Sequence, residues 1–135
     1  FMKADLMNIQ STLLNSVDSI SCLHALEHFG LGRYGDPIDY FGYLKGFENI
    51  TSILKKGGNF YFSVPIGPQR IEFNAHRIFS MKYLIDLVSK YYIIKSFSYV
   101  DDNDKFFPYE SLSEEKVNNN YGCNYGCGIF ELTKL

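Results

Sequence analysis

Two histidines and a glutamate stand at regular spacing early in the chain. His24, Glu27 and His28 form an H-x-x-E-H pattern, in which both histidines can bind zinc and the glutamate can act as a general base when one helix carries them. A zinc hydrolase would need a third ligand, for which Glu72 and His76 are candidates. The residues before His24 predict a strand that runs directly into the motif. We therefore favour the alternative, a loop at a strand end whose polar side chains face a cleft.

A second polar cluster lies at residues 74–77, shortly before a predicted helix. It brings an amide, an imidazole and a guanidinium together in Asn74, His76 and Arg77. Both clusters follow the carboxyl end of a predicted strand, and open α/β sheets bind ligands in the crevice beyond such ends. We expect the two clusters to face one cleft and to form a reaction site.

The chain between these clusters contains three glycines, Gly30, Gly32 and Gly35, with the spacing G-x-G-x-x-G. A dinucleotide-binding loop of this spacing leaves a strand directly and opens a helix. Here six residues separate the motif from the predicted strand, and Asp-Pro follows it instead of a helical run. We interpret the motif as a loop that carries Arg33 and Asp36, and not as an NAD site.

Composition limits the partners of the protein. Its 135 residues suit a single domain over residues 1–135. The 13 Lys and Arg residues stand against 15 Asp and Glu residues, so no basic field exists to attract nucleic acid or anionic lipid. The apolar runs are far shorter than the ~18–20 residues of a membrane span. We expect a small-molecule substrate and neither a nucleic-acid nor a membrane partner.

The three cysteines do not form a disulfide framework. Cys22 lies in an apolar run, whereas Cys123 and Cys127 form a C-x-x-x-C pair. The odd number of cysteines indicates reduced thiols and a cytoplasmic location. A zinc site would need C-x-x-C spacing and two further ligands, so we expect no metal at these residues.

Hydrophobic patterning predicts the elements that position these groups. Residues 17–23 are typical of a buried strand. A helix follows, because a set of apolar residues recurs on one helical face. Lys55 and Lys56 are expected in its last turn, and Gly57-Gly58 is expected to end it. The apolar residues of this helix are Tyr43, Phe47, Ile50 and Leu54.

The remaining chain continues the alternation of strands and helices. Ser80 is a candidate N-cap for a second helix, and the long connection over residues 101–127 is expected to hold a short helix with a Ser111…Glu114 capping box. This order predicts an α/β fold with a largely parallel sheet and helices on its faces. Further strands are expected at residues 59–64, ended by Pro65, and at residues 92–100 and 128–135.

Three of these segments together resemble the second half of a class I S-adenosylmethionine-dependent methyltransferase. Residues 17–28, 53–58 and 60–65 carry an Asp…Leu-Glu-His…Leu-Lys-x-Gly-Gly…Val-Pro pattern, as do the fourth strand, fourth helix and fifth strand of such enzymes. This resemblance implies a partial Rossmann-like fold whose C-terminal strand is antiparallel.

A narrower resemblance covers nearly the whole chain. Glu27-His28, residues 30–37, residues 74–77 and the terminal Gly-Cys-Gly-Ile-Phe of residues 126–130 are similar to the methyltransferase-like family DUF268. The resemblance implies S-adenosylmethionine as the cofactor. In this family, Asp5 would accept a hydrogen bond from the adenine amine, and Glu27 would border the cofactor.

The resemblance also implies roles in methyl transfer. His76 and His28 are the candidate bases that would deprotonate the acceptor. Asn74, Arg77 and Arg33 would orient or enclose a small polar acceptor, such as a sugar.

The methyltransferase's first strand and Gly-rich loop, which hold the methionine part of the cofactor, have no counterpart in the sequence. We therefore expect these residues alone to bind the cofactor weakly or to be inactive, and a non-catalytic binding or assembly module is an alternative. The family's sheet order of 3-2-1-4-5-7-6 would leave the edge of residues 17–23 open. We expect self-association, or residues 1–14, to cover this apolar edge.

Overall fold

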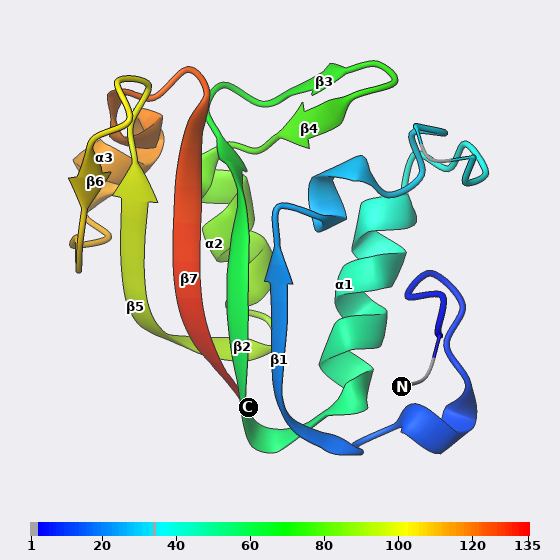
Figure 1. The fold of residues 1–135 in the computed structure, drawn as a ribbon. Coiled ribbons are helices and arrows are strands. Elements are labelled where there is room, and N and C mark those ends of the chain that lie inside the picture. The colour runs from blue at the N-terminus through cyan, green and yellow to red at the C-terminus, as the bar shows by residue number, and fades with distance from the viewer. Residues whose placement is uncertain (1–2, 34) are drawn as a thin grey trace.

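A five-stranded sheet with helices packed against it forms the framework of the protein (Figure 1). The computed structural model describes residues 3–33 and 35–135, so Phe1 and Met2 of the opening segment and Tyr34 of the glycine motif lie outside the described residues. In spatial order the strands are β1 (Val17–Leu23), β2 (Leu54–Ile66), β7 (Gly126–Lys134), β5 (Tyr92–Val100) and β6 (Phe106–Phe107).

Strand directions confirm the predicted α/β fold class. Strand β1 pairs with β2 in parallel, whereas β7 is antiparallel to both β2 and β5. Therefore β1, β2 and β5 point the same way, and the C-terminal strand β7 runs against them from its place between β2 and β5. This is the 4-5-7-6 portion of the sheet order implied by the resemblance.

The core lies between one face of this sheet and helices α1 (Gly42–Ile53) and α2 (Met81–Val88). Phe47 on α1 contacts Phe60 and Phe62 on β2, with ring centroids 6.1 and 6.0 Å apart. On the other face of β2, Tyr61 is 42% exposed. The structure therefore has two layers, with its apolar aromatic side chains concentrated on the helix side.

Helix α1 ends earlier than the sequence predicts. Leu54 already has extended backbone angles and is fully buried, so Lys55 and Lys56 belong to β2 and not to the last helical turn. An irregular register between Val17 and Ser19 accommodates this stretch. Gly58 serves close packing, because a Cβ there would lie 2.9 Å from a β1 carbonyl oxygen.

Helix α2 begins as predicted, and the Ser80 hydroxyl accepts a hydrogen bond from the Tyr83 amide at 3.3 Å. The expected capping box at Ser111 is wrong, because α3 (Glu114–Asn118) has Ser113 at its N-cap and no side-chain cap bond. The connection also contains β6 and the 3₁₀ turn Asn120–Gly122. Two other 3₁₀ turns occupy Ser11–Leu13 and Leu26–His28.

Sequence patterning missed a short hairpin that carries much of the polar chemistry. Strands β3 (Arg70–Glu72) and β4 (His76–Ile78) pair in antiparallel fashion, and Asn74 lies in their turn with a left-handed φ of 57°. Each strand has only three residues, too few to show a periodic pattern.

The described part of the N-terminal segment lies along α1. The Asn49 side chain donates to the Leu6 carbonyl at 2.8 Å, and the Asn15 amide donates to the Ser52 carbonyl at 2.9 Å. Within residues 3–33 and 35–135, β2 is the one strand paired with β1. In that same part of the chain, no helix is both long enough and apolar enough to cross a membrane.

Replacing Phe62 tests this two-layer packing. Phe62→Ala should lower the free energy of unfolding by about 3–5 kcal/mol, because it removes a fully buried ring from the aromatic core. Tyr61→Ala, on the exposed side of the same strand, is the matched control and should cost much less. Urea denaturation of both variants measures the difference. Equal losses would contradict the assignment of the covered face.

Candidate functional site

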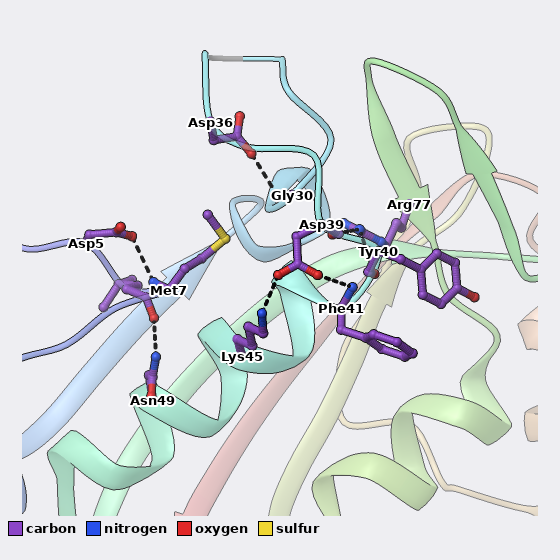
Figure 2. Close-up of polar contacts among 11 residues, drawn as sticks. Asp5, Met7, Gly30, Asp36, Asp39, Tyr40, Phe41, Lys45, Asn49 and Arg77 are labelled. Carbon is purple, nitrogen blue, oxygen red and sulfur yellow. Dashed lines mark hydrogen bonds and ion pairs between the residues drawn. The ribbon is translucent and has the colours of Figure 1, made fainter.

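A cleft of about 350 Å³ opens beyond the carboxyl end of β1. Asp5 and Met7 approach it from the N-terminal segment, His24 and His28 follow β1, and Asp36 comes from the glycine loop. In Figure 2, Met7 extends toward the loop, where the Asp36 carboxylate accepts a hydrogen bond from the Gly30 amide at 2.8 Å. The structure thus brings Asp5 and His28 to one cleft. The strand-end argument expects residues 74–77 at the same cleft, but they are not among the residues that line it, and His76 lines a separate opening of about 340 Å³.

Glu27 lies beneath the floor of this cleft, where it is 1% exposed. Its Oε1 atom is 3.2 Å from His24 Nδ1 and 3.7 Å from His28 Nε2. Its Oε2 atom is buried and has no hydrogen-bond partner among the described residues. A buried carboxylate needs a partner of opposite charge or a hydrogen-bond donor, and His24 and His28 are the side chains that lie against it.

His24 is contacted on both ring nitrogens. Its Nε2 atom lies 2.9 Å from the Cys127 sulfur, on the other side from the Glu27 contact. The hydrogen bonds with Cys127 and Glu27 raise the pKa of His24 to about 10, so the imidazole is protonated at neutral pH.

The second histidine pair joins the cleft to the hairpin. His28 Nδ1 donates a hydrogen bond to the Ala75 carbonyl at 2.5 Å, and the His28 and His76 rings meet edge to face at 6.2 Å. His76 also stacks on Tyr125 at 5.1 Å. Burial, and the nearby His28, lower the pKa of His76. His76 is therefore neutral at pH 7, which is the form a general base requires.

Arg77 has a structural position that the sequence did not predict. It is 2% exposed, and its guanidinium stacks over the Tyr43 ring at 4.7 Å. Because its guanidinium donates hydrogen bonds to backbone carbonyl oxygens, Arg77 ties β4 to the loop after β1. The four acceptors are the carbonyl oxygens of Glu27 at 3.3 Å, Phe29 at 2.5 Å, Asp39 at 3.4 Å and Tyr40 at 3.1 Å. Figure 2 shows Arg77 beside Asp39 and Tyr40.

These positions correct two of the predicted roles. Glu27 and Arg77 are buried, and their charged groups contact protein atoms, so the structure does not support direct contact of Glu27 with cofactor or of Arg77 with substrate. Arg33 and Asn74 are exposed, and the Arg33 guanidinium donates to the Asn74 carbonyl at 3.3 Å. Their contact with substrate stays a prediction.

The local backbone does not provide the helix that a zinc hydrolase motif requires. His24 has a left-handed φ of 48°, and only the 3₁₀ turn Leu26–His28 follows it. Across residues 3–33 and 35–135, no three His, Cys, Asp or Glu side chains are grouped to hold a metal ion. The H-x-x-E-H residues instead form a hydrogen-bonded loop at a strand end.

Cys127 is the polar residue that sequence reasoning left without a role. It is the second residue of β7, and the register places it opposite Pro65 of β2 and Val100 of β5. Its proximity to His24 joins positions 103 residues apart. The proximity of Cys127 to His24 could be predicted only from the antiparallel placement of β7 beside β2.

The strand order, together with a polar cleft at the carboxyl end of β1, defines a class I methyltransferase-like fold. Solved structures share it. The [4+2]-cyclase SpnF matches with a TM-score of 0.63 and 13% identity, over 99% of this chain and 56% of SpnF. The MccD protein matches with a TM-score of 0.56 and 11% identity, over 97% of this chain and 65% of MccD. The chain therefore spans less than two thirds of either structure.

The family follows from the sequence match. The model described as "Caenorhabditis protein of unknown function, DUF268" matches residues 1–124. The chain belongs to the DUF268 family, as its motifs indicated. Comparison with curated proteins gives no match.

His24 should make the free energy of unfolding fall as the pH rises from 6.5 to about 8.5. The unfolded chain releases the His24 proton near its ordinary pKa of 6.5, whereas the folded protein holds it up to about 10. The stabilisation is therefore complete below pH 6.5 and is lost as the pH rises through the folded pKa. Urea denaturation across this range measures the slope.

A His24→Asn variant is the control for this slope. The lowered pKa of His76 acts below pH 6.5, and the raised pKa of Cys22 acts near and above its ordinary value of 9.0. Neither group therefore contributes to the slope of the free energy of unfolding between pH 6.5 and about 8.5. The variant should show a nearly flat profile, and a slope equal to that of the wild type would exclude His24 as the source.

Proposed function

We propose that this domain belongs to an S-adenosylmethionine-dependent methyltransferase acting on a small hydroxylated acceptor such as a sugar. The observation that carries the proposal is the cleft at the carboxyl end of β1, where Asp5 and His28 meet in a methyltransferase-like fold. The reaction needs little beyond alignment of the acceptor with the sulfonium methyl group and a base for its proton.

The residues of the cleft suit one end of the cofactor. Asp5 is exposed and presents a carboxylate that can accept from an adenine amine, and Met7 and Phe29 supply apolar surface for the adenine ring. The Gly30–Gly35 loop leads to no helix until Gly42, so it does not resemble the loop that holds the methionine part. We propose weak binding of S-adenosylmethionine by these residues alone.

His76 is the better placed of the two candidate bases. It is neutral at pH 7, and it lines a second opening of about 340 Å³ that also includes Glu72 and Tyr125. His28 already donates from Nδ1 to a backbone carbonyl. Asn74, in the turn that leads to His76, and Arg33, which contacts the Asn74 carbonyl, would orient the acceptor's hydroxyl groups.

The fold alone does not choose the reaction, since one structural neighbour is a [4+2]-cyclase. The zinc-hydrolase and binding-module alternatives are therefore part of the test. Stoichiometric zinc in elemental analysis would support the first, and absence of cofactor affinity would support the second. The three free cysteines support our proposal of a cytoplasmic location.

Calorimetric titration with S-adenosylmethionine tests the cofactor site. Asp5→Asn should weaken binding about 10-fold, because a hydrogen bond to a charged group contributes roughly 1.5–3 kcal/mol. Asp86→Asn, at an exposed position of α2, is the matched control and should bind as the wild type does. Equal affinities of the two variants would remove Asp5 from the site.

The same titration separates binding from chemistry at His76. His76→Ala should retain cofactor affinity and should reduce turnover by roughly 100-fold. Release of S-adenosylhomocysteine in the presence of small hydroxylated acceptors measures turnover. Unchanged turnover would exclude His76 as the base.

We also propose that two copies associate through the open edge of β1. Exposed backbone groups on such an edge can pair with another strand, and the described part of the N-terminal segment lies along α1 instead. A small-molecule substrate remains the other partner that we propose.

Sedimentation velocity tests the association. The wild type should sediment as a dimer. A double variant, Ser19→Lys with Ser21→Lys, should be monomeric because it sets like charges across the paired edges. Ser111→Lys adds a positive charge at an exposed position outside β1 and should remain dimeric. A monomeric wild type would refute the interface.

A further inference from the structure

Three side chains from distant parts of the chain form a continuous line at the carboxyl end of the sheet. The Cys127 sulfur lies 2.9 Å from His24 Nε2, and His24 Nδ1 lies 3.2 Å from Glu27 Oε1. We infer that Cys127, His24 and Glu27 form a nucleophilic thiol site, which takes small neutral or cationic electrophiles. This inference does not depend on methyl transfer.

The order of the groups is the one that activates a nucleophile. An imidazole beside the thiol takes its proton, and a carboxylate on the other ring nitrogen orients the ring and balances the charge of the imidazolium. Here the carboxylate is almost completely buried: its Oε1 atom faces His24, and its Oε2 atom has no hydrogen-bond partner among the described residues. The buried negative charge favours a protonated His24.

The thiol is open to small molecules. Cys127 is partly exposed, and a cavity of about 260 Å³ lies over it, between His24 and Tyr125. His24 also lines the larger cleft with Asp5. An electrophile can therefore reach the sulfur without displacing the core.

The charged groups around this cavity determine which electrophiles it admits. Asp101, Asp102 and Asp104 line it from the turn after β5. The Asp102 carboxylate accepts from the amides of Asn124 and Tyr125 at 2.8 and 2.9 Å, which fixes it near the cysteine. The three carboxylates repel anions and attract cations, so a cationic reagent should react faster than an anionic reagent of the same kind.

The other two cysteines provide internal controls. Cys22 and Cys123 are 6% and 5% exposed, and burial raises the pKa of each thiol to about 11. Both therefore lack thiolate at neutral pH. Neither has a histidine contact among the hydrogen bonds of residues 3–33 and 35–135.

Methanethiosulfonate reagents probe the site with a balanced reaction. At pH 7 His24 is the protonated partner, and the Cys127 thiolate that it holds by a hydrogen bond attacks the reagent's sulfenyl sulfur. A mixed disulfide forms as the reagent's S–S bond breaks, and methanesulfinate leaves with the electron pair. The ethyltrimethylammonium and ethylsulfonate derivatives supply the cationic and anionic forms.

Peptide mapping by mass spectrometry of the full chain, at pH 7 under native conditions, follows each cysteine. Cys127 should be modified at least ~10-fold faster than Cys22 and Cys123, and about 10-fold faster by the cationic than by the anionic reagent. Because all three thiols are in one molecule, this comparison needs no variant. Equal rates at the three cysteines would overturn the inference.

Two variants test the residues around the sulfur. His24→Asn should slow modification of Cys127 about 10-fold or more. Asp104→Asn should leave the rate of Cys127 modification by a neutral reagent unchanged, and it should lower the ratio of the cationic to the anionic rate. Circular dichroism confirms that each variant is folded. A folded His24→Asn protein with the wild-type rate would show that Cys127 is merely accessible.

Discussion

Burial of the Arg77 guanidinium is the constraint on which the whole polar end of the sheet depends. A charge removed from water must recover its solvation from the protein, and Arg77 recovers it from four backbone carbonyls of the segment between β1 and α1. That segment has no regular structure over residues 35–40. The Arg77 side chain therefore holds this segment in place, as the backbone hydrogen bonds of a helix or strand would in a regular element.

Close backbone contact completes this arrangement. A Cβ on Gly30 would lie 2.0 Å from the Asp39 carbonyl oxygen, and one on Gly42 would lie 2.9 Å from Gly30. Only glycine permits the two ends of the loop to touch, and Gly30 also has a left-handed φ of 77°. The first glycine of G-x-G-x-x-G thus permits the close contact of Gly30 with Asp39 and Gly42, which is a structural role unrelated to a dinucleotide.

Patterning in the sequence could predict the elements with long periodic patterns, and the family resemblance implied the order of the sheet. Residues 92–100 match β5 at both ends, because alternation and a preceding capped helix bound them. It could not predict where α1 stops, since Leu54 leaves the helix to pair with Val17 of β1, three residues before the first of the glycines. Among site residues, it placed His28 at the cleft, but it took buried Arg77 for a ligand. A guanidinium looks the same in sequence whether carbonyls or substrate accept its hydrogen bonds.

Glu27 connects the two chemical functions of this end of the sheet. Its one partnered oxygen faces both His24, which lies against Cys127, and His28, which reaches the hairpin through the Ala75 carbonyl. The contacts on either side are too short to leave room for water between these groups. A covalent change at the sulfur would remove a hydrogen-bond partner of His24, which would then bind Glu27 differently and alter the charge that His28 experiences. The Cys127 thiol and the cleft are therefore both linked to the buried Glu27 carboxylate, the thiol through His24 and the cleft through His28.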